Sequence, residues 1–431
     1  MAEPALSNSA PAPEFRWPQR YTVVALFGLA TVLCYVDRVS ISVAIIPLAR
    51  DLGYDSARQG IILSAFFWGY LLTQLLGGVV ADRAGGKWVL AAGVGIWSLA
   101  TFLTPPATAA FSLLLAMRVL LGLGEGVNFP AIHSLTARWI PIAERARMLS
   151  LNFSGMHVGT VTAFILSPPI IVAFGWPALF YITGAIGGIW VAVWIVRVPR
   201  HPPDSPANSS AASRADAPQD AHGLAARAPA IPWMKIAREK SVWAIVIAHF
   251  CSNFGYYILL LWLPTYLNYT FNVPLSEVGA YSLPPWIAAI ISINAGGWIA
   301  DSLLLRGMHI TVVRKLMQSV AFTLSALPLL FVPSVESSFT AVMLVTVSVA
   351  ANGLGLAGFG VNHLDVGPDH AGILMGISNT VATIPGIVGV AAAGFIVQAT
   401  GSFSAVFYLA AAIYLAGMFG YLAWATGERR L

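Results

Sequence analysis

The chain has 431 residues, of which 58% are hydrophobic and 10% are charged, and its formal net charge is +5. Soluble domains carry about 25% charged residues, so this composition excludes an ordinary soluble domain. It predicts instead an all-α protein with many membrane-spanning helices. The two cysteines, Cys34 and Cys251, both lie in apolar segments and have neither disulfide nor metal-ligand spacing.

Twelve apolar segments are long enough to cross a bilayer, which takes about 20 helical residues. They fall into two groups of six, separated by a polar stretch. The first group is residues 21–47, 59–81, 88–107, 110–137, 147–173 and 177–197. The second group is residues 241–267, 277–300, 312–332, 338–361, 371–398 and 402–425. We therefore expect two six-helix halves, residues 21–197 and 241–425.

Three polar segments flank and separate these halves. Residues 198–240 are rich in Ala, Ser, Asp and Pro and end in the basic residues Lys235, Arg238 and Lys240. Such a composition is typical of a flexible linker. Residues 1–20 and 426–431 are expected to be tails, and residues 1–20 lack the apolar core of a secretory signal.

The lysines and arginines predict how the helices are oriented. If both tails are cytoplasmic, all but four of the 23 Lys and Arg residues lie in cytoplasmic tails and loops. Arg50 and Arg58 then lie outside, and Arg38 and Arg118 lie within the membrane. An excess of positive charge in short cytoplasmic loops is the general rule for membrane proteins. We therefore predict that both termini and the linker are cytoplasmic.

Four charged residues lie inside predicted spans: Asp37 and Arg38 in the first, and Arg118 and Glu125 in the fourth. A charged side chain at the bilayer centre costs at least about 2.5–3.5 kcal/mol, so such residues usually serve a function. Arg118 and Glu125 are about two helical turns apart and share a face, whereas the adjacent Asp37 and Arg38 point about 100° apart. We expect Arg38 to face a central cavity and Asp37 to face a neighbouring helix. The alternative is an internal ion pair that only joins helices.

These four charges sum to zero, which suggests how a proton and an anion bind together. Protonation of one carboxylate leaves an arginine uncompensated, and an entering anion restores neutrality. Each ligand then favours binding of the other, as symport requires. The planar fork of arginine suits carboxylate and phosphate groups. We predict that Glu125 is the main proton carrier and that Asp37 is the second.

The two halves also repeat a loop motif. The end of the second span carries Gly78-Val-Val-Ala-Asp82-Arg83-Ala-Gly85-Gly-Lys87, and the end of the eighth carries Gly297-Trp-Ile-Ala-Asp301. Parallel six-helix repeats form a transporter architecture whose solute site lies at the midplane. The first motif resembles the loop motif of the major facilitator superfamily.

Further segments resemble one branch of that superfamily, the anion:cation symporters. They are residues 35–45, 66–70, 122–126, 139–147 and 372–379. This branch includes sialin, the vesicular glutamate transporters, bacterial sugar-acid symporters and plant organellar phosphate transporters. Residues 249–255, 263–266 and 361–365 are most similar to the plant phosphate-transporter group.

The resemblance implies a major facilitator fold of twelve transmembrane helices that works by alternating access. It also implies that Arg38 contacts the substrate anion and that Asp37 takes part in proton coupling. Asp82 and Arg83, with Asp301 in the second half, are implied to gate the transporter as a conformational latch. Polar residues of spans 2, 7 and 11 are candidates to contact the rest of the solute, with helix packing or backbone capping as the alternative; they are Tyr70, Gln74, Asn253, Tyr256, Ser378 and Asn379.

Histidine titrates near neutral pH when unperturbed, and four histidines lie in or at the ends of predicted spans without metal-ligand spacing: His133, His157, His249 and His363.

We expect a secondary active transporter of anions, either inorganic phosphate or a small organic carboxylate, working by proton- or cation-coupled symport. The alternatives are an anion facilitator or exchanger driven by the membrane potential, and a non-transporting sensor on the same fold.

The partners expected from the sequence are a small anionic solute, a co-transported proton or sodium ion, and the lipid bilayer. No enzymatic activity, cofactor, metal or nucleic-acid partner is expected. We expect a monomer in the plasma or inner membrane, with an organellar membrane as the alternative.

Overall fold

The structure is a computed structural model that describes residues 19–140, 142–199 and 232–431. Within these ranges every regular element is a helix. Most of the predicted N-terminal tail and linker, residues 1–18 and 200–231, lies outside the described residues. The expectation of an all-α protein is therefore confirmed for the described chain.

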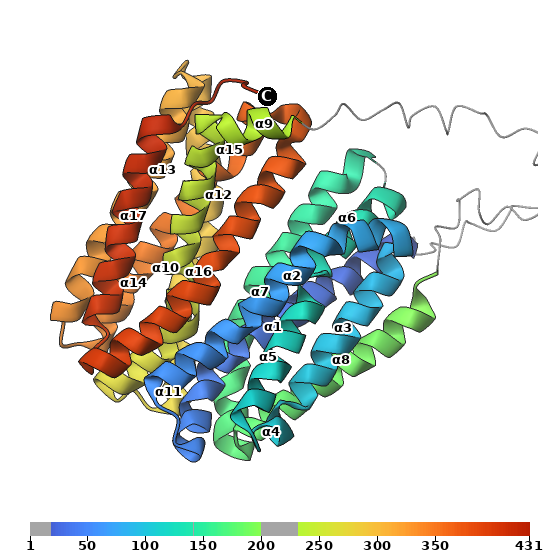
Figure 1. The fold of residues 1–431 in the computed structure, drawn as a ribbon, viewed down its shortest axis with the longest axis vertical. Coiled ribbons are helices and arrows are strands. Elements are labelled where there is room, and N and C mark those ends of the chain that lie inside the picture. Colours follow the sequence, from blue (N-terminus) through green and yellow to red (C-terminus); the bar gives the residue numbers. More distant parts are fainter. Residues whose placement is uncertain (1–18, 141, 200–231) are drawn as a thin grey trace, which may run out of the picture.

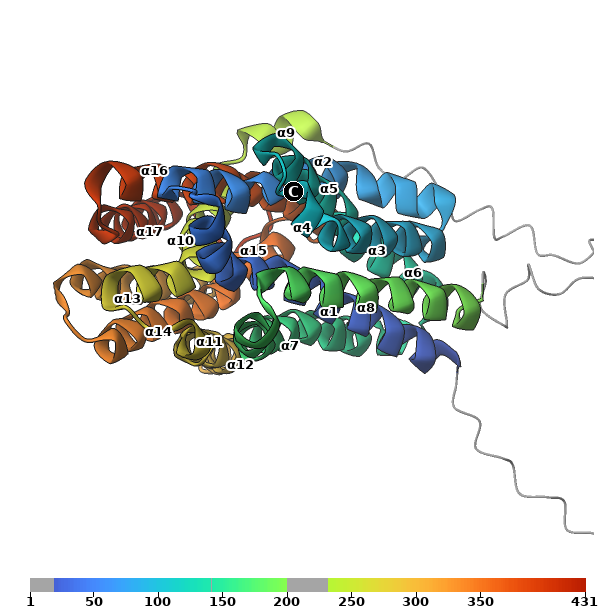
Figure 2. The same ribbon diagram turned by 90° about the horizontal axis from the view of Figure 1, so that it is seen from below.

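The described residues of the N-terminal half form the helices α1 (Gln19–Leu52), α2 (Ser56–Ala84), α3 (Gly86–Phe102), α4 (Thr104–Ala107), α5 (Phe111–Glu125), α6 (Asn128–Trp139), α7 (Ile142–Phe174) and α8 (Trp176–Arg197). After the short α9 (Trp233–Arg238), the C-terminal half contains α10 (Lys240–Phe271), α11 (Leu275–Ser282), α12 (Pro284–Leu305), α13 (Ile310–Phe331), α14 (Ser338–Leu354), α15 (Phe359–Val366), α16 (Ala371–Thr400) and α17 (Ser404–Trp424). The two halves lie side by side (Figures 1 and 2).

Four predicted spans are each built from two consecutive helices, and the sequence at each break explains it. Proline lacks an N–H group and begins helices rather than continuing them. Accordingly, α4 contains Pro105 near its start and α12 begins at Pro284. Glycines separate the other two pairs, with Gly126 between α5 and α6 and Gly358 directly before α15. Ten helices or runs of helices in the described chain are long and apolar enough to cross a membrane, and α2 and α3 complete twelve.

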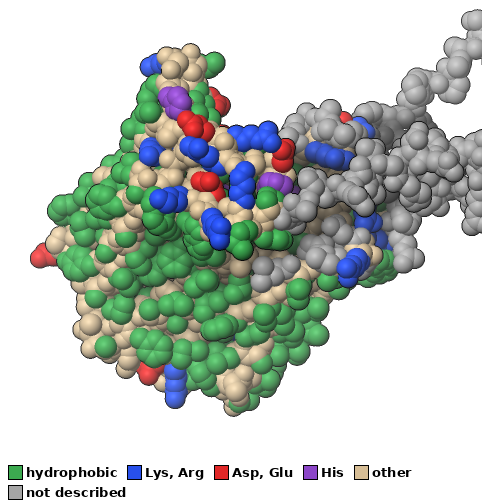
Figure 3. All heavy atoms as spheres, turned by 45° about the horizontal axis from the view of Figure 1, so that its top comes forward, with side chains coloured by type: hydrophobic (Ala, Val, Ile, Leu, Met, Phe, Trp, Pro, Cys, Tyr) green, Lys and Arg blue, Asp and Glu red, His purple; other side chains and the backbone are tan. Residues whose placement is uncertain are grey.

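The surface of the bundle has the pattern expected of a membrane protein. Its middle zone is covered largely by apolar side chains, while basic side chains gather at the end that carries the C-terminus (Figure 3). The exposed basic residues of the C-terminal half at that end include Lys235, Arg238, Lys240, Arg306, Arg429 and Arg430. Backbone groups that face lipid are satisfied inside each helix, so the outward side chains of the middle zone need not be polar.

The two halves pack against each other through α1 with α10, α2 with α16, and α7 with α11. The α2–α16 contact runs from the start of α2, where the Ser56 amide donates to the Gln398 side chain (3.2 Å), as far as Gln74, which accepts a hydrogen bond from Thr383. A Cβ built on Gly60 would lie 3.1 Å from the Cα of Gly394. The far end of α2 instead contacts its own half, since Gly77 lies against Val127. The halves therefore meet at the end away from the C-terminus (Figure 1).

Helices α2 and α5 approach so closely that glycine is needed at their contact. A Cβ on Gly122 would overlap the carbonyl oxygen of Phe66, and a Cβ on Gly69 would overlap that of Val119. Small residues allow such close backbone approach in membranes. This contact sets the position of α5, which carries both Arg118 and Glu125.

We expect Gly122→Ala to lower the thermal stability of the purified protein, because overpacking a tight contact costs about 1–3 kcal/mol. Gly188→Ala on α8 is the matched control, since a Cβ there meets open space. Alanine favours a helix over glycine by about 1 kcal/mol, so the control should be neutral or stabilising. Equal melting temperatures for the two variants would contradict the close contact.

Candidate functional site

The carboxylate of Glu125, at the end of α5, is paired with Arg38 of α1. Nη2 and Nε of Arg38 donate to Oε2 of Glu125 at 2.8 and 3.0 Å. The Cys34 thiol donates to the same oxygen at 3.2 Å. Glu125 has no exposed surface. From the sequence, Glu125 was expected to share a helix face with Arg118. Cys34, which lies one helical turn before Arg38, was not among the predicted site residues.

Arg118 lies beside this pair, and among the described residues its guanidinium has no ion-pair partner. Its side chain is 1% exposed, and its Nε and Nη1 groups are enclosed without a hydrogen-bond partner in the described part of the chain. The guanidinium carbon lies 5.8 Å from the centre of the Phe66 ring. A buried charge with no compensating group is costly, so this position favours an anionic ligand.

Asp37 faces away from the Arg38–Glu125 pair, as the 100° offset between adjacent residues predicts. Its carboxylate instead lies near the Thr183 side chain of α8. Its Oδ1 atom is enclosed and has no hydrogen-bond partner among the described residues. Asp37, Arg38, Arg118 and Glu125 are all buried, and we call them the central charge cluster.

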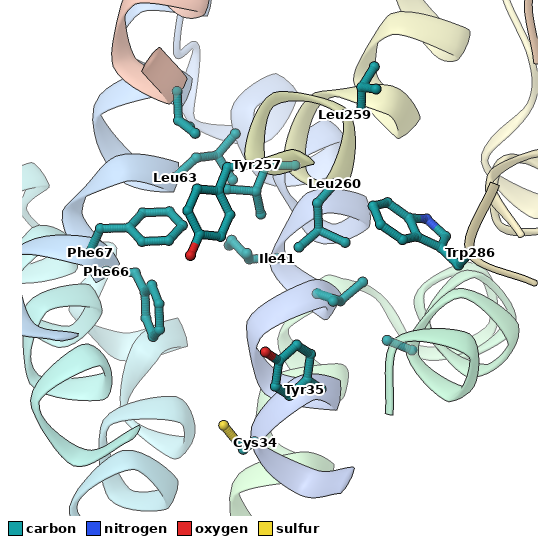
Figure 4. Close-up of a cluster of buried hydrophobic side chains, with 14 of the residues drawn as sticks. Cys34, Tyr35, Ile41, Leu63, Phe66, Phe67, Tyr257, Leu259, Leu260 and Trp286 are labelled. Carbon is teal, nitrogen blue, oxygen red and sulfur yellow. The ribbon is translucent and has the colours of Figure 1, made fainter. Parts of the chain in front are cut away.

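Aromatic rings surround Arg38 and separate the cluster from the C-terminal half. The Arg38 guanidinium carbon lies 4.6 Å from the ring centre of Tyr35 and 4.8 Å from those of Phe66 and Tyr70. Rings around a guanidinium stabilise it by cation–π attraction. Phe67 then contacts Tyr257 of α10 with ring centres 4.6 Å apart (Figure 4). Of these rings, only Tyr70 was among the candidates identified from the sequence.

Of the other polar candidates, Gln74 lies at the interface between the halves, whereas Asn253 and Tyr256 contact helices of their own half. The Thr383 hydroxyl of α16 donates to Gln74 of α2 (3.2 Å), so Gln74 links the two halves. Asn253 donates to the carbonyl of Ala382 (3.0 Å). The Tyr256 ring packs edge-on against Trp286 at 5.4 Å.

The remaining two candidates differ in burial. Asn379 is half-buried, and its backbone carbonyl accepts a hydrogen bond from Thr383 (2.9 Å). Ser378 is fully buried between His249 and His363 and not beside the central charge cluster. Ser378 therefore contacts side chains of its own half, and its role in solute binding stays a prediction.

The predicted latch residues lie at the end of the bundle that carries the C-terminus. The side chain of Asp82 lies outside the described residues, and the side chains of Arg83 and Asp301 are exposed. A buried ion pair at this end of the C-terminal half joins Arg314 of α13 to Asp365 of α15, with Nε–Oδ2 2.7 Å and Nη2–Oδ1 3.3 Å. Sequence reasoning did not predict this pair.

The membrane-spanning helices form a bundle of two halves and bury charged side chains near its middle. This arrangement is typical of multi-pass membrane transporters. The family model of the Major Facilitator Superfamily matches residues 27–390. The chain therefore belongs to the Major Facilitator Superfamily.

Similar proteins include several from plants. The chain is 42% identical over 419 residues to "Probable anion transporter 4, chloroplastic" of Oryza sativa subsp. japonica, covering 96% of this chain and 70% of that protein. It is 42% identical to "Ascorbate transporter, chloroplastic" of Arabidopsis thaliana, covering 100% and 79%. It is 40% identical to "Sodium-dependent phosphate transport protein 1, chloroplastic" of Arabidopsis thaliana, covering 96% and 80%.

Among solved structures, the fold resembles a bacterial homologue of the human lysosomal transporter Spinster in an inward-facing and occupied conformation. The TM-score is 0.76 with 17% sequence identity, covering 95% of this chain and 96% of that chain. This likeness concerns the fold alone.

Proposed function

We propose that this protein is a secondary active transporter of anions, with inorganic phosphate or a small organic carboxylate as substrate and a proton or sodium ion as the coupled cation. The observation that carries the proposal is the buried guanidinium of Arg118 beside the Arg38–Glu125 pair, whose enclosed Nε and Nη1 groups have no hydrogen-bond partner among the described residues. The names of the plant relatives, which include an ascorbate and a phosphate transporter, support an anionic substrate.

In this proposal Arg118 is the first docking group for the anion. Its unpaired N–H groups supply charge-assisted hydrogen bonds, which are stronger than neutral ones. The anion replaces the missing negative charge beside Phe66 and so lowers the cost of burying Arg118. Because Arg118 is almost fully enclosed, the surrounding helices must separate to admit the solute.

Glu125 couples a cation to this step because it competes with the anion for Arg38. While Glu125 is ionised, it accepts both hydrogen bonds from the Arg38 fork. A proton on Glu125 removes its charge and leaves Arg38 available to the anion beside Arg118. Two arginines then face one anion, which suits a phosphate or carboxylate group. Asp37, with its unpartnered Oδ1 atom, is the second candidate to carry a proton.

We further propose that both tails are cytoplasmic, as the distribution of lysine and arginine predicts. The halves meet at the end away from the C-terminus, so on this orientation the structure is closed to the outside. For the location we propose the plasma or inner membrane, with an organellar membrane, as in the names of the plant relatives, as the alternative. A monomer is the proposed functional unit.

Uptake into proteoliposomes tests the proposed function. We expect accumulation of labelled phosphate or ascorbate when an inward proton or sodium gradient is imposed, and none in liposomes that contain Arg118→Ala. Accumulation that follows the membrane potential alone would favour the facilitator alternative. If no anion of a phosphate, ascorbate and dicarboxylate panel is taken up or exchanged, the transport proposal is wrong.

The latch motif leads to a separate prediction. We expect Asp82→Asn to slow turnover more than it raises KM, because a latch changes the balance between conformations and not the solute contacts. Asp301→Asn, at the matching position of the second half, serves as the comparison. Initial uptake rates at several anion concentrations provide the measurement. An unchanged kcat for Asp82→Asn would leave the motif with a role in topology only.

A further inference from the structure

Two buried histidines in the C-terminal half are joined through one serine hydroxyl. Nδ1 of His249 on α10 lies 3.1 Å from Oγ of Ser378 on α16, and Nε2 of His363 on α15 lies 2.8 Å from the same oxygen. Nδ1 of His363 lies 3.0 Å from the carbonyl oxygen of Gly360. We call His249, Ser378 and His363 the histidine chain.

The Gly360 carbonyl determines which ring nitrogens of the histidine chain carry a hydrogen and which way the Ser378 hydroxyl points. A carbonyl oxygen only accepts, so Nδ1 of His363 carries a hydrogen, and Nε2 of the neutral ring is an acceptor. The Ser378 hydroxyl therefore donates to Nε2 of His363, and its oxygen accepts from Nδ1–H of His249. Neutral His249 consequently has an unprotonated Nε2, which makes no hydrogen bond in the described part of the chain. His249 is 8% exposed.

We propose that the histidine chain is a second proton-binding site of this protein, separate from the central charge cluster. A hydronium ion gives its proton to Nε2 of His249, where an N–H bond forms and a water molecule is released. The Nδ1–H bond of His249 breaks as its proton passes to Oγ of Ser378, and the original hydroxyl proton passes to Nε2 of His363. The net result is one added proton, a positive charge on His363, and neutral His249 in its other tautomer.

The surroundings supply hydrogen-bond partners for both states of the histidine chain. The Ser378 hydroxyl has a second acceptor in the Met375 carbonyl (3.2 Å), so it is not left unsatisfied when Nε2 of His363 gains a proton. On α15 the nearest carboxylate in sequence is Asp365, which is paired with Arg314 of α13. From α17, the Tyr421 hydroxyl bonds to Asn362 beside His363 (2.9 Å).

The histidine chain also lies in line with side chains that lead to the central charge cluster. His249, Asn253 and Tyr257 follow one another at single-turn spacing on α10. Ser378 and Ala382 of α16 face the first two of them, and Tyr257 contacts Phe67. A positive charge on the histidine chain would therefore lie on the path of the anion in the proposed transport cycle. This effect on transport rests on the proposed function.

The proton-binding site is tested without transport by nitrogen-15 NMR of histidine-labelled full-length protein in nanodiscs. At alkaline pH we expect both rings to be protonated at Nδ1. On acidification His363 should become an imidazolium and His249 should switch to the Nε2–H tautomer, both with one midpoint, because uptake of a single proton changes both rings. Variants His249→Gln and His363→Gln assign the signals.

Ser378→Ala should separate the two midpoints by about one pH unit or more, since it removes the coupling group. Thr380→Ala is the matched control, because that hydroxyl bonds only within α16, to the Gly376 carbonyl (2.8 Å). Ser378→Thr keeps a hydroxyl and should keep a single midpoint, which guards against a folding defect in the alanine variant. Independent titration in the unaltered protein, or Nε2–H on His249 at alkaline pH, would overturn the proposal.

A transport measurement then separates the two proposals. In Glu125→Gln, the rate of anion exchange should still depend on pH, and Ser378→Ala in that background should shift the midpoint of this dependence. An identical pH profile with and without Ser378 would refute a role of the histidine chain in transport. Absence of exchange in every variant and in the unaltered protein would count against the proposed function, while the NMR result would still decide the proton-binding site.

Discussion

Arg118→Ala is expected to abolish anion binding while leaving the protein as stable as before or more stable. The Arg118 side chain is buried beside the Arg38–Glu125 pair with enclosed N–H groups that have no partner in the described chain, so its removal relieves an uncompensated charge. Each charge-assisted hydrogen bond lost from the anion costs about 1.5–3 kcal/mol, which corresponds to roughly 10- to 150-fold in Kd.

Arg38→Ala should behave differently, because Arg38 has a partner. Its removal leaves the carboxylate of Glu125 buried without its cation, and breaking a buried pair in this way costs about 3–5 kcal/mol. We therefore expect Arg38→Ala to lower both the melting temperature and the affinity for the anion. Glu125→Ala in the same chain should restore part of the stability, since it removes the charge left unpaired.

Binding titrations and melting curves on one set of purified variants provide the test. Arg118→Lys should rescue binding poorly because lysine lacks the planar fork. Arg58→Ala is a control at an exposed arginine of α2 and should change neither quantity. Near-normal anion binding by Arg118→Ala would remove this residue from the site, and a large loss of stability in that variant would mean that Arg118 has a structural partner.

Glu125→Gln is expected to separate anion exchange from uphill accumulation. Glutamine imitates the protonated carboxyl group permanently, so Arg38 keeps an uncompensated positive charge. Anion binding should then persist or tighten, and Kd should depend less on pH. Accumulation driven by a proton gradient should disappear, because no proton can be released from this position. Exchange of internal for external anion should survive, since exchange needs no net proton movement.

The measurement is counterflow and gradient-driven uptake on a single Glu125→Gln preparation, with Asp37→Asn tested in parallel. Gradient-driven accumulation at the wild-type level would exclude Glu125 as the coupling residue and make Asp37 the leading candidate. Loss of both modes would assign the Arg38–Glu125 pair a purely structural role in joining α1 to α5. A loss confined to accumulation supports coupling through Glu125.

The amino-acid sequence by itself determined the membrane class, the twelve spans and the four buried charges. Span length and hydropathy are local properties, because each helix satisfies its own backbone hydrogen bonds in lipid. The repeated Gly-x-x-x-Asp motif indicated two related halves. It is also a local feature, because both copies are visible in the sequence without knowledge of how the helices pack. Charged residues such as Asp37 and Arg118 stand out in apolar segments because burying them is costly.

Only the tertiary structure decided which of these groups meet. Glu125 lies two turns from Arg118 on the same face, yet its hydrogen-bond partner is Arg38, distant in sequence, because the close α2–α5 contact at Gly122 and the approach of α1 set the geometry. Ser378 was a candidate for solute binding, and the packing of α10, α15 and α16 places it between two histidines. Partner choice depends on distances across helices of a few ångströms, and sequence spacing carries no information about those distances.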